Sequence, residues 1–196
     1  MKHPLEFIPL NLRKPMFYVF FVMTIAIFGI FNILDQPLRT DVAPNGIVSL
    51  ELAGTPEKVF QILVSWEPIN VQGPAIYKMK GYLSAVFGLG FDYLFMPTYA
   101  LGLSLGLLIA IGNKVNRYAV FATWMGWGVF LAAFFDAIEN YMLWRILTGD
   151  IISPYPEIAA ICATIKFILL ILGLVTALAG RFFFKVIQIL PLRIVL

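Results

Sequence analysis

The sequence has one cysteine, Cys162, and one histidine, His3, among its 196 residues. These counts exclude a disulfide framework within the chain and any metal or haem site built from several cysteines or histidines. Charge is also scarce: Asp, Glu, Lys and Arg make up 13% of the residues, whereas about 25% is usual in soluble domains. Hydrophobic residues make up 61%, a composition that predicts a chain lying largely in lipid.

Four long apolar runs predict an all-α membrane protein, a bundle of four transmembrane helices. The first run, residues 15–34, carries no charge and has about the 20 residues that a helix needs to cross a bilayer. We expect it to be a retained anchor, because it is longer than the apolar region of a signal peptide and no cleavage motif follows. The other predicted spans are residues 87–112, 118–147 and 158–180, with short turns at 113–117 and 148–157.

Basic residues are distributed unevenly between the two sides of this predicted bundle. The arm at 1–14, the turn at 113–117 and the tail at 181–196 carry eight basic residues and one acid. Residues 35–86 and 145–157 carry five basic and seven acidic residues. The positive-inside rule therefore predicts two cytoplasmic termini and a long extracytoplasmic loop at 35–86. The net charge of +3 is thus a topology signal, and we expect no nucleic-acid partner.

The extracytoplasmic loop is predicted to contain a short strand. Val48, Leu50 and Leu52 alternate with the polar Ser49 and Glu51, which is the period of a half-buried strand. A single strand has no partner in this chain. The segment is therefore either plain extended chain or a strand that pairs with the sheet edge of another protein.

Two further segments outside the spans have helical signals. In the loop, Thr55 as N-cap and Pro56 as the first helical residue predict an amphipathic helix through Trp66. The tail at 181–196 places basic residues at helical spacing among bulky apolar ones. It is either a helix lying in the cytoplasmic interface or a continuation of the last span that ends near Pro191.

Four ionisable residues fall within the predicted spans: Asp92, Asp136, Glu139 and Lys166. Counted from the cytoplasmic ends of their helices at 1.5 Å per residue, they lie at depths of roughly 21 to 32 Å. A lysine side chain extends several ångström farther, so we expect all four to meet in the outer leaflet. Three acids exceed one lysine, and the excess must be relieved by protonation, by Arg145, by water or by a bound cation.

Helical spacing places the polar residues of each span on the face that carries small residues, and such faces pack against other helices. Gly102 and Gly106 form a GxxxG pattern. The predicted helix-packing positions are Gly102, Gly106, Gly128, Ala132, Ala163 and Gly173. The predicted polar cluster, which is either ligand-binding or purely structural, contains Asp92, Tyr99, Asp136, Glu139, Asn140 and Lys166. We expect no metal site and no cofactor, because no ligand-loop spacing is present.

Two motifs are similar to those of a known group of proteins. The segments FDYLFMPTYA (91–100) and FDAIENYMLWRIL (135–147) resemble the signatures of small uncharacterised bacterial four-helix integral membrane proteins. These have a D-x-L-F-x-P-x-Y-A second helix and a D-A-x-E-N third helix. GIVSLELAGTPEK (46–58) resembles their outer segment. The resemblance implies a four-helix fold in a bacterial inner membrane and carries no biochemical activity.

These patterns favour an accessory or scaffold subunit of a larger membrane complex. Aromatic-rich spans, a GxxxG face and an unpaired strand are typical of a chain that packs on other membrane subunits. The alternative is a small membrane enzyme or carrier for a lipid-like ligand in the outer leaflet, with Asp136 or Glu139 as general base and Lys166 as electrostatic stabiliser. The expected partners are the lipid bilayer, other membrane protein subunits and bound lipid.

Overall fold

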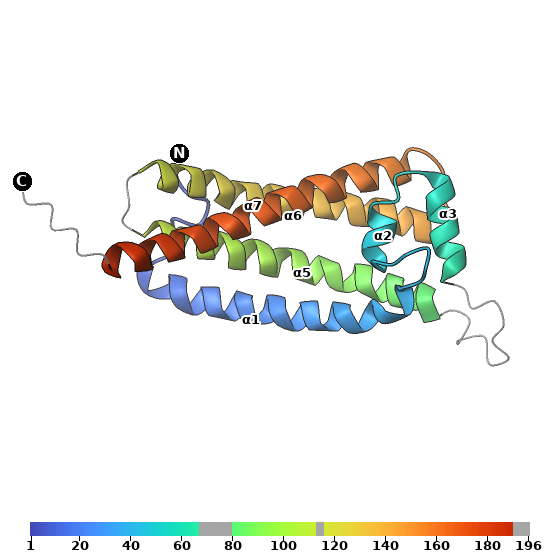
Figure 1. Cartoon of the computed structure of the whole chain (residues 1–196), viewed down its shortest axis with the longest axis horizontal. Helices are drawn as coiled ribbons and strands as arrows, with labels where there is room; N and C mark the ends of the chain where they lie inside the picture. Colours follow the sequence, from blue (N-terminus) through green and yellow to red (C-terminus); the bar gives the residue numbers. More distant parts are fainter. Residues whose placement is uncertain (67–79, 113–115, 190–196) are drawn as a thin grey trace, which may run out of the picture.

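Four long helices form the body of the protein (Figure 1). The computed structural model describes residues 1–66, 80–112 and 116–189, and side chains only up to residue 180. The long helices are α1 (Leu10–Leu34), α5 (Lys80–Ile111), α6 (Arg117–Leu147) and α7 (Tyr155–Ile189). Each contains a stretch long and apolar enough to cross a membrane. The prediction of an all-helical, multi-pass membrane protein is confirmed.

The helix ends differ from the predicted spans by several residues. Helix α1 begins five residues earlier and α5 seven residues earlier than predicted, and α7 runs without interruption past the predicted span to Ile189. The predicted tail is therefore a continuation of α7 up to that residue, and Pro191 lies outside the described residues. Asn116 caps α6, because its Oδ1 accepts a hydrogen bond from the Ala119 N–H at 3.0 Å.

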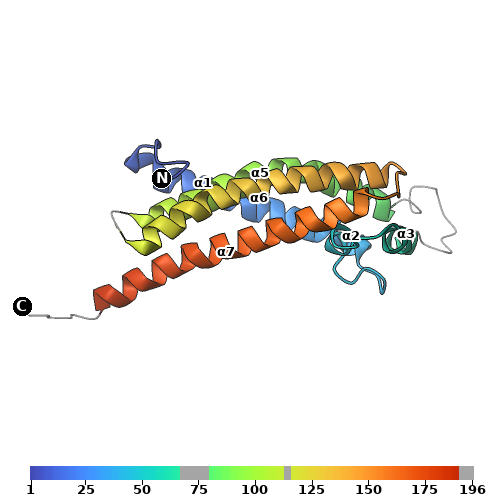
Figure 2. The same ribbon diagram turned by 90° about the horizontal axis from the view of Figure 1, so that it is seen from above.

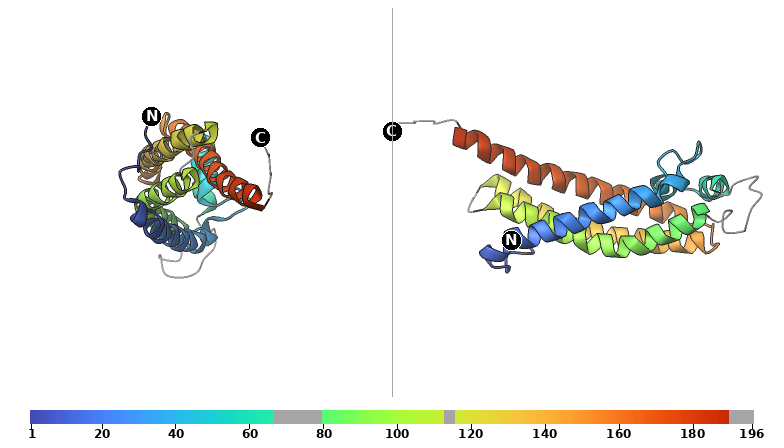
Figure 3. Two further views of the ribbon diagram at one scale, coloured as in Figure 1. Left: turned by 90° about the vertical axis from the view of Figure 1, so that its left-hand side faces the viewer. Right: turned by 90° about the horizontal axis from the view of Figure 1, so that it is seen from below.

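Helix α5 is central and contacts each of the other long helices. Seen along the bundle axis, α1 and α7 lie on different sides of α5 (Figure 3). Helix α7 packs along α6, and its C-terminal half diverges from α5 and α6 (Figure 2).

The GxxxG pattern is used within the chain, between α5 and α1. A Cβ atom added at Gly102 would lie 3.4 Å from Phe20 Cβ, and one added at Gly106 would lie 3.2 Å from Phe17 Cε2. On α7, a Cβ atom added at Gly173 would lie 3.1 Å from Val129 Cγ2. Three other predicted packing positions are also at least half-buried: Gly128, Ala132 and Ala163.

Three short helices in residues 35–66 form a cap over one end of the bundle: η1 (Gln36–Leu38), α2 (Ile47–Glu51) and α3 (Pro56–Ser65). The prediction of α3 is confirmed, and Thr55 Oγ1 accepts the Lys58 N–H at 3.4 Å. The predicted strand is wrong, because its residues form α2 and no described residue lies in a strand. Leu52, expected to be buried, is 45% exposed, whereas Glu51 is 8% exposed.

The cap is packed onto its own bundle. Trp66 Nε1 donates a hydrogen bond to the Leu38 carbonyl at 2.8 Å. Val59 and Ile62 of α3 are buried in a hydrophobic core that also contains Leu89 of α5. Residues 67–79 of the predicted loop lie outside the described residues, and its last residues, 80–86, belong to α5. One set of apolar side chains in the described part of the loop is thus buried against the ends of the long helices.

The N-terminal arm, residues 1–9, packs at the end of the bundle opposite the cap (Figure 1). Leu5 and Ile8 are buried in a core with Leu105 of α5. His3 is buried beside α6, where a Cβ atom added at Gly126 would overlap its Nε2. Burial and the nearby Arg13 charge lower the pKa of His3 to about 4. The C-terminal end of α7 lies at this same end of the bundle.

Candidate functional site

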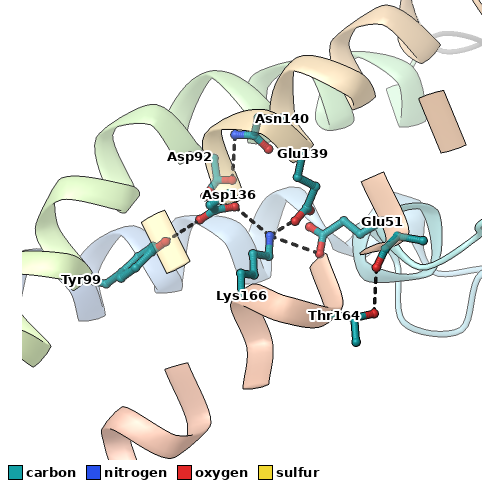
Figure 4. A network of polar contacts seen from close by, with 9 residues as sticks. Glu51, Asp92, Tyr99, Asp136, Glu139, Asn140, Thr164 and Lys166 are labelled. Atoms are coloured by element: carbon teal, nitrogen blue, oxygen red, sulfur yellow. Dashed lines mark hydrogen bonds and ion pairs between the residues drawn. The ribbon is translucent and has the colours of Figure 1, made fainter. Parts of the chain in front are cut away.

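A buried lysine lies at the centre of a group of carboxylates near the capped end (Figure 4). Lys166 Nζ on α7 donates hydrogen bonds to Asp136 Oδ1 at 2.8 Å and to Glu139 Oε1 at 2.9 Å, both on α6. It also lies 3.6 Å from Glu51 Oε2 on α2. Lys166 is 5% exposed, Asp136 is 2% exposed and Glu139 is fully buried. One ammonium group therefore joins three carboxylates from two helices.

Helix α5 contributes two further polar groups, Tyr99 and Asp92. Tyr99 OH donates a hydrogen bond to Asp136 Oδ2 at 2.8 Å, and Asp92 Oδ2 accepts one from Asn140 Nδ2 at 2.8 Å. The structure thus brings all six residues of the predicted polar cluster together and adds one that the sequence analysis did not include. We call the set the polar network: Glu51, Asp92, Tyr99, Asp136, Glu139, Asn140 and Lys166 (Figure 4).

Helix geometry explains why α6 supplies three of these groups. Asp136, Glu139 and Asn140 are at i, i+3 and i+4, so they lie on one face of the helix. That face is turned toward α5 and α7, the helices that carry Asp92 and Lys166. Tyr99, Asp92 and Lys166 contact this face of α6 from the neighbouring helices.

Glu51 is positioned by the end of α1. Asp35 follows α1 directly, and its Oδ1 accepts a hydrogen bond from the Ile47 N–H at 2.8 Å, which satisfies a free donor at the start of α2. Gly46 precedes α2 with φ of +57°, and a Cβ atom there would overlap the Asp35 carboxylate. The Asp35 contact fixes the start of α2. Glu51 is the last residue of this helix, and its side chain lies beside Lys166.

Glu51 was missed because the alternation in 48–52 places it on the polar side of a strand. One signal pointed the other way: Glu51 is the only charged residue between Asp41 and Glu57 and is flanked by leucines. An acid in such an apolar stretch requires a partner if the stretch is buried.

The network has more acids than bases. Four carboxyl groups face one ammonium group, and Arg145 does not compensate them because it forms an ion pair with Asp150 at 2.6 Å. Burial raises the pKa of Glu51, although Lys166 opposes this effect. Within the described residues, Glu51 Oε2 and Glu139 Oε2 are buried without a hydrogen-bond partner.

A pocket of about 440 Å³ lies against the polar network. Glu51, Asp92, Asp136 and Lys166 reach its surface. Most of the remaining wall is apolar and comes from α1, α5 and α7, including Phe28, Phe31, Leu89, Phe95, Phe167 and Leu170. Phe28 is 57% exposed, so the pocket reaches the outer face of α1. The site therefore combines a charged floor with aromatic walls.

The groups of the network differ in their access to this pocket. Glu139 does not line it and has no exposed surface. Asp136 lines it, but Lys166 and Tyr99 occupy both of its oxygens. These contacts do not suit the role of general base that the sequence suggested for either residue. Asp92 and Glu51 are the carboxyl groups with free capacity at the pocket.

No group of three His, Cys, Asp or Glu residues in the described parts of the chain is arranged to hold a metal ion. Comparison of the chain with protein-family models, with curated proteins and with solved structures gives no match. The function is therefore argued from the geometry of the polar network and the pocket.

Proposed function

We propose that this multi-pass membrane protein is a carrier that binds a lipid-like amphiphile in the pocket at its capped end. The observation that carries the proposal is the pocket itself, in which apolar walls from three helices meet charged groups on the floor. Its volume of about 440 Å³ lies within the range of small-molecule sites, about 300 to 1,000 Å³.

The chemistry of the walls supports an amphiphilic occupant. Phenylalanines of α1, α5 and α7 suit an acyl or prenyl chain, and the charged groups suit a polar head. Charged residues inside membrane spans are costly and often mark functional sites. A purely structural network would not require a pocket next to it.

Two of the features that predicted an accessory subunit make their contacts within this chain and need no partner protein. The expected partner-binding strand is helix α2, which contacts α3 and α7. The GxxxG face of α5 is covered by α1. One feature still favours that function as a second candidate, namely a row of exposed aromatic residues on α6 that includes Trp124, Phe134, Tyr141 and Trp144.

The location of the protein is part of the same proposal. The arm at 1–14, the turn at 113–117 and the tail at 181–196 carry eight basic residues and one acid in the sequence, which supports cytoplasmic termini and an extracytoplasmic cap. The pocket and its carboxyl groups then lie in the outer leaflet. The resemblance of residues 91–100 and 135–147 to bacterial four-helix proteins supports a bacterial inner membrane.

Native mass spectrometry of the protein extracted in mild detergent tests the proposal. A Cβ atom added at either Gly88 or Gly90 of α5 meets no atom within 4 Å, but only Gly88 lines the pocket. We expect wild type and Gly90→Phe to retain bound lipid, and Gly88→Phe to lose it because the phenyl ring fills the pocket. Equal retention by all three proteins, or no bound lipid in wild type, would contradict the proposal.

The same spectra test the second candidate. An accessory subunit should be released with a second protein chain at fixed stoichiometry, and replacing Trp124 and Phe134 by leucine should remove that chain. Lipid-loaded protein without a second chain favours the carrier.

A further inference from the structure

The charges around the pocket specify the kind of head group that fits it. Glu51, Asp92, Asp136 and Glu139 belong to the polar network, and Lys166 is its only cation among the described residues. The other charged groups at the pocket, Asp35 and Arg39, form an ion pair at 2.9 Å. In a site shielded from water, such an excess of carboxyl groups is held only if protons or another cation neutralise it.

Two of the carboxyl groups that line the pocket, those of Glu51 and Asp92, have an oxygen without a hydrogen-bond partner among the described residues. Glu51 is 8% exposed, and its Oε2 has no hydrogen-bond partner in the described chain. Lys166 Nζ is 3.6 Å away, beyond hydrogen-bond distance, because its shorter contacts are with Asp136 and Glu139. Asp92 uses Oδ2 to accept the Asn140 amide, and Oδ1 has no partner among the described residues. Glu51 and Asp92 come from different elements, α2 and α5, that both line the pocket.

The aromatic walls add a second preference for positive charge. Rings of Phe28, Phe31, Phe95, Tyr99 and Phe167 line the pocket, and cations are stabilised over the faces of aromatic rings. Phe167 already has such a neighbour, since Lys166 Nζ lies 5.0 Å from its ring centroid. An anionic head would instead meet the carboxyl groups, and both cations at the pocket, Lys166 and Arg39, are already paired with carboxylates.

We propose that the ligand is a cationic amphiphile, an alkyl amine or alkyl ammonium compound, whose head binds between Glu51 and Asp92 in exchange for protons. This inference rests on the proposed function. In the free protein the excess carboxyl groups carry protons. When a monovalent cation enters, one carboxylic O–H bond breaks, the carboxylate pairs with the ligand, and one proton leaves to the solvent. The charge of the site is unchanged, which favours the exchange in a low-dielectric environment.

Titration calorimetry on the whole protein in phosphatidylcholine nanodiscs tests this exchange. The probe is dodecyltrimethylammonium at micromolar concentration, with empty nanodiscs as the blank. Release of one proton per probe predicts that affinity rises about tenfold per pH unit over the range in which protons leave. The heat of binding should also depend on the ionisation enthalpy of the buffer. A constant affinity between pH 5.5 and 7.5 with no buffer dependence would overturn the proposal.

Matched variants locate the head group. Glu51→Gln and Asp92→Asn should each weaken probe binding about tenfold or more, because each removes a charged acceptor, and should reduce proton release. Glu57→Gln, which alters an exposed acid of α3, should leave both unchanged. Equal effects of Glu57→Gln and the two pocket variants would contradict the assignment. If a pocket variant does not fold, the pH dependence of probe binding to wild type still tests the exchange of the cation for a proton.

Two other probes separate this inference from the proposed function. Dodecanol and dodecyl sulfate carry the same chain with a neutral or anionic head. If they bind as tightly as the ammonium probe and are excluded by Gly88→Phe, the pocket takes amphiphiles but the preference for cations is wrong. If no probe distinguishes wild type from Gly88→Phe, the proposed function itself fails.

Discussion

Lys166 Nζ and Asp136 Oδ1 lie 2.8 Å apart on α7 and α6, and both side chains are almost fully buried. Desolvation of such a pair offsets much of its Coulombic attraction, so the pair contributes less to stability than its short distance indicates. Removing one partner has a larger effect, because the other charge is left buried and uncompensated. The two residues should therefore be strongly coupled.

A double-mutant cycle measures this coupling. We expect Lys166→Met to destabilise the protein by about 3 to 5 kcal/mol, since Asp136, Glu139 and Glu51 lose their common cation. Adding Asp136→Asn should recover part of the loss, with a coupling energy of at least about 0.5 kcal/mol. Unfolding in detergent micelles provides the measurement. Lys58→Met, at an exposed position of α3, is the control. Strict additivity of the two substitutions would mean that the observed contact has no energetic weight.

A second prediction concerns the contact between α5 and α1. A Cβ atom at Gly102 or Gly106 would already be in tight contact with Phe20 or Phe17, so the longer leucine side chain at these sites should destabilise the protein by about 1 to 3 kcal/mol per site, as overpacking does. Gly90→Leu introduces the same side chain on the same helix where a Cβ meets no atom within 4 Å. It should be nearly neutral or stabilising. Thermal unfolding of the three variants checks this, and equal melting temperatures would contradict the packing of α1 on α5.

Much of the bundle could be predicted from the sequence because each span is encoded by a long run of apolar residues. Runs of about 20 apolar residues define a span regardless of tertiary context. Helical spacing was sufficient to place Asp136, Glu139 and Asn140 on one face, and small residues marked the contact surfaces. The GxxxG pattern predicted a close approach but not the partner, since it indicates only that a backbone comes near.

The cap could not be predicted in the same way. Over five residues, the alternation in 48–52 fits a strand as well as a turn of helix. The choice is decided by contacts distant in sequence, namely Asp35 at the start of α2 and Lys166 beside Glu51. For the same reason the pocket, which is lined by residues from α1 to α7, has no local signature.

A third prediction tests the orientation of the chain in the membrane. Asn45 in the cap and Glu6 in the N-terminal arm are both exposed and lie at opposite ends of the bundle. With cytoplasmic termini, Asn45→Cys should react with an impermeant thiol reagent in intact cells, whereas Glu6→Cys should react only after lysis. The native Cys162 is buried, so its background labelling should be low. The reverse pattern would overturn the orientation.

The fourth prediction concerns the N-terminal arm and pH. A free histidine has a pKa near 6.5, and burial together with the Arg13 charge lowers that of His3 to about 4. Between these values the unfolded chain binds a proton that the packed arm excludes. The contribution of His3 to stability is therefore fully present above pH 6.5 and is lost as pH falls toward 4.

Comparison with His3→Asn isolates this contribution from that of the buried acids. His3 Nδ1 accepts a hydrogen bond from the Leu5 N–H at 3.2 Å, and an asparagine carbonyl can replace this acceptor but does not titrate. The melting temperatures of the two proteins in micelles should diverge as pH decreases from 6.5 to 4, because the melting temperature of wild type should fall further. Parallel curves over that range would show that His3 titrates as a free histidine does, and that the arm is not packed beside Gly126.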